Sequence, residues 1–191
     1  MWLALALGLA LAPGPQGALP HAQRRGRIEQ QASIVKRLGP EAFPRLGGPV
    51  RTMLQRLRCT VPQTASTVQP HNVIRGRFLS AQSSQWAILC SRDRTSTVLV
   101  IDDTGKVLAT LGRGDDVNYM QADGHGAFVY AREIAVVHPD QMRTALERYG
   151  DSGQAQTLRF DHDGIDDRFV DAASITFFWS AGKWVEFVGA D

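Results

Sequence analysis

The chain contains 191 residues, of which 43% are apolar, 21% charged and 8% aromatic. A chain of this length and composition can bury one substantial core, which excludes a disordered or fibrous protein. Its 21 Lys and Arg residues nearly balance 19 Asp and Glu residues, which leaves a formal net charge of +2. The composition therefore predicts one globular domain with no electrostatic attraction to nucleic acid or to an anionic membrane surface.

An uncharged apolar run covers residues 1–12 and ends at Pro13. The run is long enough for the apolar region of a secretory signal peptide and shorter than the about 20 residues of a transmembrane helix. We therefore predict a signal peptide over residues 1–22, no transmembrane span, and a periplasmic or secreted protein that is a monomer. A buried N-terminal helix is the alternative interpretation of the same run.

Export makes the cysteines informative, because an oxidising compartment allows them to pair. The two cysteines of the sequence, Cys59 and Cys90, lie 31 residues apart. A disulfide between them would contribute roughly 3 to 4 kcal/mol to stability by the chain-entropy estimate. We predict this disulfide, with two separate buried thiols as the alternative.

Residues 23–70 are predicted to form a helical N-terminal segment. Apolar residues recur at helical spacing from Ile28 to Leu38, and Gly39 and Pro40 then end the first predicted helix. A second helix is predicted after Pro49, where an apolar stripe occupies positions 50, 53, 54 and 57. Both stripes are interpreted as packing surfaces.

Residues 71–191 are predicted to form a β-rich domain with one inserted helix near residues 139–149. The turn at residues 102–106 predicts a hairpin between the segments on either side of it. Apolar and β-branched residues indicate extended segments at 73–74, 78–79, 86–90, 97–101, 107–111, 127–137, 157–160, 168–170, 174–179 and 183–188. The predicted fold class is α+β, with a mainly antiparallel sheet of blade-like hairpins, N-terminal helices and the inserted helix.

Two stretches of the β-rich region resemble each other. In the first, Phe78 is followed by a polar loop, two strands and the pair Gly105-Lys106. In the second, Phe160 is followed by an acidic loop, two strands and the pair Gly182-Lys183. This order predicts a degenerate internal repeat, although a plain succession of hairpins would produce a similar pattern.

The repeated order of Phe, loop, two strands and Gly-Lys turn resembles the FG-GAP or VCBS type of repeat of secreted proteins. The resemblance implies four-stranded propeller blades and a calcium loop of pattern Asp-x-Asp-Gly-x-x-Asp, which Asp161, Asp163, Gly164 and Asp167 match. The chain also resembles secreted bacterial proteins that end in a similar Asp-His-x-Gly-Ile-x-Asp segment and a Gly-Lys-Trp turn, a resemblance that implies no known activity. Two units are too few to close a propeller, so we expect a small β-sheet with packed helices instead.

The chemistry of the acidic loop allows two interpretations. Calcium takes six to eight oxygen ligands, and Asp161, Asp163 and Asp167 could supply carboxylates, with Asp166 as a further ligand. A plain Asx-type turn between two strands is the alternative, because an Asp- and Gly-rich turn needs no ion. We expect His162 to point to solvent, because calcium sites rarely use imidazole.

Two functions remain open. The first is a non-enzymatic module that binds a protein or glycan, with Trp86, Trp179 and Trp184 as candidate anchors and calcium stiffening the loop. The alternative is a small extracytoplasmic hydrolase in which Asp163 and Asp167 act directly or through a metal. His125, which lies near Asp123, is interpreted as a turn histidine rather than as part of an acid/base pair. The sequence contains no nucleophile elbow, zinc-protease or phosphate-loop motif, which favours the binding module.

Overall fold

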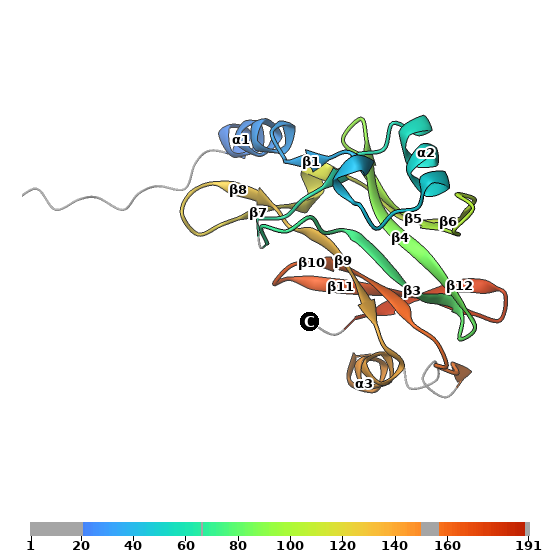
Figure 1. Cartoon of the computed structure of the whole chain (residues 1–191). Coiled ribbons are helices and arrows are strands. Elements are labelled where there is room, and N and C mark those ends of the chain that lie inside the picture. Colours follow the sequence, from blue (N-terminus) through green and yellow to red (C-terminus); the bar gives the residue numbers. More distant parts are fainter. Residues whose placement is uncertain (1–20, 66, 150–156, 190–191) are drawn as a thin grey trace, which may run out of the picture.

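The computed structural model of the chain describes residues 21–65, 67–149 and 157–189 (Figure 1). The predicted signal peptide therefore lies outside the described residues, except for His21 and Ala22, which begin the first helix. No described helix is long and apolar enough to cross a membrane. The described helices are α1 (His21–Ser33), α2 (Gly48–Arg56), α3 (Pro139–Tyr149) and the 3-10 helices η1 (Pro40–Ala42) and η2 (Asp116–Tyr119).

Two four-stranded antiparallel sheets form the centre of the molecule. The first sheet has the order β3 (Val73–Ser80), β4 (Ser83–Arg92), β5 (Thr95–Ile101) and β6 (Val107–Asp115). The second sheet has the order β9 (Arg132–Val137), β10 (Gly164–Phe169), β11 (Ala173–Ser180) and β12 (Lys183–Val188). The α+β class with mainly antiparallel sheets is therefore confirmed, as are the hairpin of β5 with β6 and the inserted helix α3.

The two sheets share a strand order, which bears on the predicted repeat. The pairs Gly105-Lys106 and Gly182-Lys183 both lie at the turn between the third and fourth strands of their sheets. Phe78, however, lies in the first strand of its sheet, whereas Phe160 precedes the second strand of the other. The Gly-Lys correspondence is confirmed and the Phe correspondence is wrong. The resemblance to the FG-GAP or VCBS family stays a prediction.

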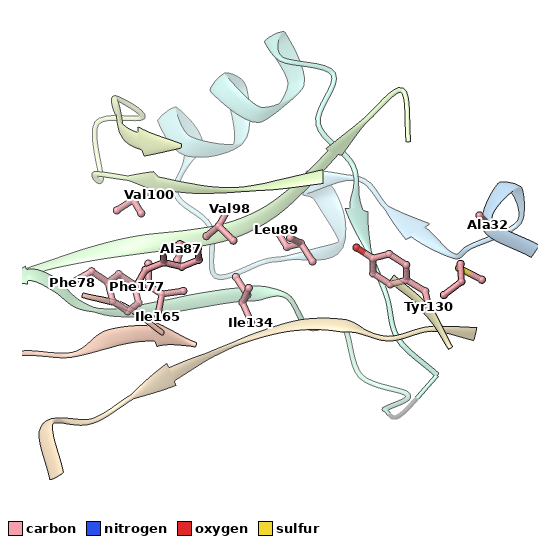
Figure 2. Close-up of a cluster of buried hydrophobic side chains, with 11 residues drawn as sticks. Ala32, Phe78, Ala87, Leu89, Val98, Val100, Tyr130, Ile134, Ile165 and Phe177 are labelled. Atoms are coloured by element: carbon pink, nitrogen blue, oxygen red, sulfur yellow. The ribbon is translucent and has the colours of Figure 1, made fainter. Parts of the chain in front are cut away.

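The inner faces of the two sheets pack against each other and form the main core (Figure 2). Phe78, Leu89 and Val100 of the first sheet meet Ile165 and Phe177 of the second, and all five side chains are buried. Burial of apolar side chains at roughly 1.5 to 3 kcal/mol each is the main force that holds the sheets together.

Helices cover the outer faces, so the molecule has four layers (Figure 1). Val50 and Leu54 of α2 pack on Ile88 and Ile101 of the first sheet, which explains why β4 and β5 are buried on both faces. On the other side, Met142 and Leu146 of α3 pack on the second sheet. Their partners there include Val137, Phe178 and Phe187.

Two short sheets complete the described fold. The strand β1 (Arg37–Leu38) pairs with β2 (Val61–Pro62), and β7 (Met120–Ala122) pairs with β8 (Phe128–Tyr130). The predicted first helix therefore ends at Ser33, because pairing with β2 holds Arg37 and Leu38 in extended conformation.

The predictions for the acidic region are partly wrong. Leu158 to Phe160 belongs to no strand, and β10 begins at Gly164, inside the predicted turn. The physical reason is that β10 pairs along both of its edges, with β9 and with β11. Two ladders of backbone hydrogen bonds outweigh the local preference of Asp and Gly for a turn.

Candidate functional site

Asn72 closes part of the free edge of β9. Its side-chain Nδ2 donates to the carbonyl oxygens of Pro62 and Arg132, at 2.8 and 3.3 Å, and its Oδ1 accepts from the backbone N–H of Ile134 at 2.9 Å. Asn72 is buried and has a φ of 67°, a left-handed conformation that Asn adopts more readily than most residues. The side chain thus bonds β9 as a neighbouring strand would.

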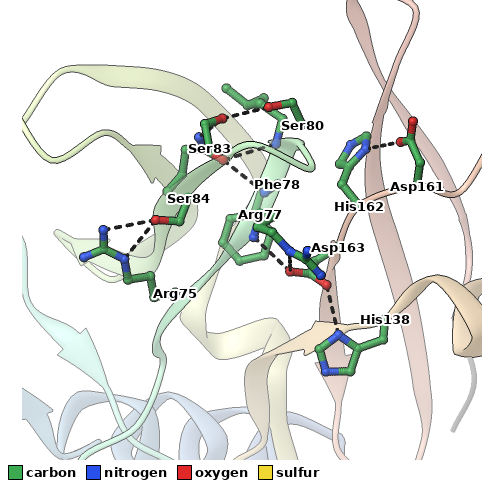
Figure 3. Close-up of polar contacts among 12 residues, drawn as sticks. Arg75, Arg77, Phe78, Ser80, Ser83, Ser84, His138, Asp161, His162 and Asp163 are labelled. Atoms are coloured by element: carbon green, nitrogen blue, oxygen red, sulfur yellow. Dashed lines mark hydrogen bonds and ion pairs between the residues drawn. The ribbon is translucent and has the colours of Figure 1, made fainter.

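Asp163 closes part of the free edge of β3 in the way that Asn72 closes that of β9 (Figure 3). Its Oδ2 accepts from the backbone N–H of Arg77 at 2.9 Å, and its own backbone N–H donates to Arg77 O at 2.9 Å. The other carboxylate oxygen, Oδ1, lies 2.9 Å from His138 Nδ1. Burial alone would raise the pKa of Asp163, but the hydrogen bonds from Arg77 and His138 lower it below its ordinary value.

A cavity of about 420 Å³ lies beside these two closed edges, and we call it the edge cavity. Its volume is within the range of about 300 to 1,000 Å³ found for ligand pockets. Its charged lining residues are Arg45 and Arg75. Its apolar lining includes Phe43, Leu46, Val73, Ile74, Trp86 and Val136.

Trp86 forms a rigid wall of the edge cavity. Its side chain is 4% exposed, and its indole Nε1 donates to Asp103 Oδ1 at 3.0 Å. The guanidinium of Arg75 lies 4.9 Å from the centre of the indole ring and donates to Asp103 Oδ2 at 2.7 Å. Exposed Arg45, in contrast, makes no hydrogen bond or ion pair with any residue that the structure describes. It is therefore available to a ligand.

The other candidate anchors, Trp179 and Trp184, lie elsewhere. They face each other across β11 and β12, with ring centres 5.6 Å apart in an edge-to-face arrangement, and both are partly exposed. Neither lines the edge cavity. Of the three candidate anchors, Trp86 is the one that lines the edge cavity.

The four aspartates of the predicted calcium loop are held by different partners. Asp167 accepts two hydrogen bonds from Arg132, at 2.9 and 2.6 Å, between the two sheets. Asp166, the next residue back along β10, points to the opposite face, where Arg168 Nε donates to it at 2.7 Å. Asp161 bonds His162 Nδ1 at 2.6 Å, which lowers the pKa of the Asp161 carboxyl.

This arrangement does not fit a calcium ion. Within the described part of the chain, no group of three or more His, Cys, Asp or Glu residues could hold a metal. Asp166 and Asp167 point to opposite faces of β10, because successive side chains of a strand alternate, and Asp161 and Asp163 precede the strand and bond other partners. Calcium binding therefore stays a prediction without support from the geometry.

Arg132 ties the two sheets together from the inside. Besides Asp167, its guanidinium donates to Ser96 O and Oγ at 3.2 and 2.9 Å and to the carbonyl of Gly112, all in the first sheet. Burial alone would lower the pKa of Arg132, but Asp167 raises it. The pair is a structural link between sheets, and Asp167 is not free for catalysis.

The histidines are placed by local contacts. The prediction that His162 points to solvent is wrong: the residue is 5% exposed, and its ring stacks on Phe178 with centres 4.5 Å apart. His125 is a turn residue as predicted, since Asp123 Oδ1 accepts its backbone N–H at 2.8 Å.

The predicted disulfide is present between Cys59 and Cys90, whose Cα atoms lie 5.4 Å apart. It joins the chain after α2 to the C-terminal end of β4. The bond thereby links the N-terminal segment, which carries Phe43 and Arg45, to the strand that carries Trp86.

Comparisons with family models, with curated proteins and with solved structures gave no match. The assignment of a site therefore depends on the geometry alone. Sequence reasoning missed Asn72, Arg45 and Arg75. A polar residue directly before a strand is a weak signal for an edge-closing side chain, and nothing in the sequence near Arg45 indicates that it faces a cavity.

Proposed function

We propose that the protein is an exported, non-enzymatic binding module and that the edge cavity is its ligand site. The observation that carries this proposal is a ligand-sized cavity with a rigid tryptophan wall and an arginine that has no partner within the described residues. Apolar pockets with a few polar groups are the usual form of a binding site.

The lining defines the chemistry of the ligand. Phe43, Leu46 and Trp86 favour an apolar group, because burial of such a group releases water from apolar surface. Arg45 favours a negative charge at the same ligand, since guanidinium groups bind carboxylates in paired hydrogen bonds. A protein partner offers both features together more readily than a glycan does.

Export is supported by the apolar run at the start of the chain and by the disulfide between Cys59 and Cys90. Cell fractionation, together with the intact mass of the purified protein, tests this part of the proposal. We expect a protein in the extracytoplasmic fraction that lacks a segment of about the length of a signal peptide. A cytoplasmic protein with the mass of the full chain would contradict it.

The ligand site is tested with anilinonaphthalene sulfonate, an aromatic anion that matches the lining. We expect one saturable site whose binding raises the fluorescence of the dye. Ala42→Phe, which fills the cavity from a lining residue, should abolish the signal. Ala172→Phe adds the same ring at an exposed turn and is the matched control. Equal dye binding by both variants would locate the dye elsewhere and reject the edge cavity as the site.

The hydrolase alternative is less well supported. Asp163 and Asp167, its proposed carboxylates, accept hydrogen bonds from Arg77 and Arg132 and sit at the junction of the two sheets. Carboxylates in these positions hold strands together, and neither lines the edge cavity.

A further inference from the structure

We propose that the edge cavity captures the C-terminal end of an extended peptide, which adds as a short strand to the open edge of β3. This inference rests on the proposed function, because it uses the same cavity. It goes further by specifying the chemistry of the ligand and the backbone atoms that hold it.

The register of β3 determines which of its backbone groups face the cavity. Leu89 N donates to Asn72 O, so these two residues form a hydrogen-bonded pair of the ladder with β4. Such pairs alternate with pairs that make no mutual hydrogen bond, and Val73 and Arg75 occupy the alternate positions. Their backbone N–H and C=O groups therefore point away from β4. Both residues line the edge cavity, and no described residue bonds these groups.

Arg77, two residues further along β3, shows what such outward groups bind. Its N–H and C=O are taken by the side chain and the backbone N–H of Asp163, each at 2.9 Å. This is the pattern of bonds that a neighbouring strand makes. The edge of β3 is therefore closed at Arg77 and open at Val73 and Arg75.

A further wall of the cavity comes from β9, the edge strand of the second sheet. Ile134 N donates to the side chain of Asn72, so the backbone N–H and C=O of Ile134 point away from β10. The backbone groups of Val136, two residues later, point the same way. Val136 lines the same cavity. Val136 thus adds an apolar wall from the neighbouring strand, while β3 supplies the unpaired backbone groups that strand addition uses.

The short length of the open edge favours binding of the end of a peptide over binding of a segment from the middle of a longer chain. Asn72 lies at one end of the edge and Asp163 closes the other at Arg77. At about 3.3 Å per strand residue, this edge accommodates about three or four residues. A C-terminal residue places an apolar side chain next to a carboxylate, which matches the apolar cavity and the available Arg45.

The test uses the purified full chain and a pool of acetylated heptapeptides of random sequence with an apolar last residue and a free C-terminus. The same pool with amidated C-termini is the control. We expect enrichment of free-carboxylate peptides only. In hydrogen exchange, an enriched peptide should protect the amides of Val73 and Arg75, which have no partner in the free protein, and leave the amide of Ile74, already bonded to β4, unchanged.

Two substitutions at one position isolate the backbone contribution. Arg75→Pro and Arg75→Ala both remove the side chain, but only Pro removes the outward N–H, which the ladder with β4 does not use. We expect Arg75→Pro to bind the peptide about three- to tenfold more weakly than Arg75→Ala, the effect of one hydrogen bond. Arg45→Gln should weaken the free-carboxylate peptide and leave the contrast between the two Arg75 variants unchanged.

The outcomes separate this inference from the proposed function. If anilinonaphthalene sulfonate binds the cavity but no peptide protects Val73 and Arg75, strand addition is rejected and the binding module stands. If neither the dye nor a peptide binds, both proposals fail. Equal recovery of amidated and free peptides would reject the C-terminal carboxylate.

Discussion

The guanidinium of Arg132 in β9 donates two hydrogen bonds to the carboxylate of Asp167 in β10, and the pair lies between the two sheets. The same guanidinium also bonds Ser96 and Gly112 of the first sheet. The side chain of Arg132 is fully buried, so water cannot replace any of these bonds.

We predict that Arg132→Leu destabilises the protein by about 3 to 5 kcal/mol, because it leaves the carboxylate of Asp167 buried without its partner. The double substitution Arg132→Leu with Asp167→Leu should recover part of this loss, since it removes the unpaired charge. Urea unfolding of the three proteins measures the difference. Arg143→Leu removes a similar contact from Asp140 on the surface of α3 and should cost far less. A small effect of Arg132→Leu would show that the sheets do not depend on the pair.

Substitutions of Asn72 should separate the contribution of its side-chain hydrogen bonds to stability from that of its left-handed backbone conformation. Asn72→Gly tolerates the positive φ of this position but loses the bonds to Arg132 O and Ile134 N, so we expect a loss of about 1 to 3 kcal/mol. Asn72→Ala should lose about 1 kcal/mol more, because a residue with a Cβ is strained in the left-handed region. Thermal melting compares the two variants. Equal stabilities would contradict the conformational part of the argument.

The lowered pKa of Asp163 predicts how the free energy of unfolding changes as the pH falls. Its pKa is lower in the folded protein than in the unfolded chain, so the unfolded chain binds the proton first as the pH falls. The stability contributed by the carboxylate is present above the ordinary Asp pKa of 3.8 and is lost as the pH falls through the lower folded value. Unfolding measured between neutral pH and acid should therefore be steeper for the wild type than for Asp163→Asn. Asp93→Asn changes an exposed carboxylate and should leave the slope unchanged.

Removal of the disulfide should lower stability and loosen the edge cavity. The substitution of both Cys59 and Cys90 by Ser should cost about 3 to 4 kcal/mol by the chain-entropy estimate. Reducing agent should shift the melting temperature of the wild type in the same direction and leave that of the double variant unchanged. Two free thiols in the mass spectrum of the unreduced protein would contradict the disulfide itself.

Calcium provides a direct test of the acidic region. Because Asp161, Asp163, Asp166 and Asp167 bond different partners, we expect millimolar calcium to leave the melting temperature unchanged. A bound ion at a hundredfold excess over its Kd would add about 2.7 kcal/mol to stability, which melting detects easily. A rise in melting temperature that Asp163→Asn abolishes would support the calcium interpretation and require a different arrangement of this region.

Local patterns in the sequence were sufficient for several elements. The apolar stripe and Pro49 predict α2, and the turn from Asp102 to Lys106 predicts the hairpin of β5 and β6. In that turn, Asp102 Oδ1 accepts the backbone N–H groups of Thr104 and Lys106, at 2.9 and 3.0 Å. Such contacts lie within a few residues of each other, so periodicity and turn chemistry predict them.

Only the tertiary structure determined the role of the acidic residues and the position of the cavity. Asp163 bonds Arg77 across 86 positions of the chain, and Asn72 bonds Arg132 across 60. The register of β10, set by pairing with β9 and β11, sends Asp166 and Asp167 to opposite faces. The sequence carries no local signal for these partners, because they depend on how two sheets, formed by distant segments, pack together.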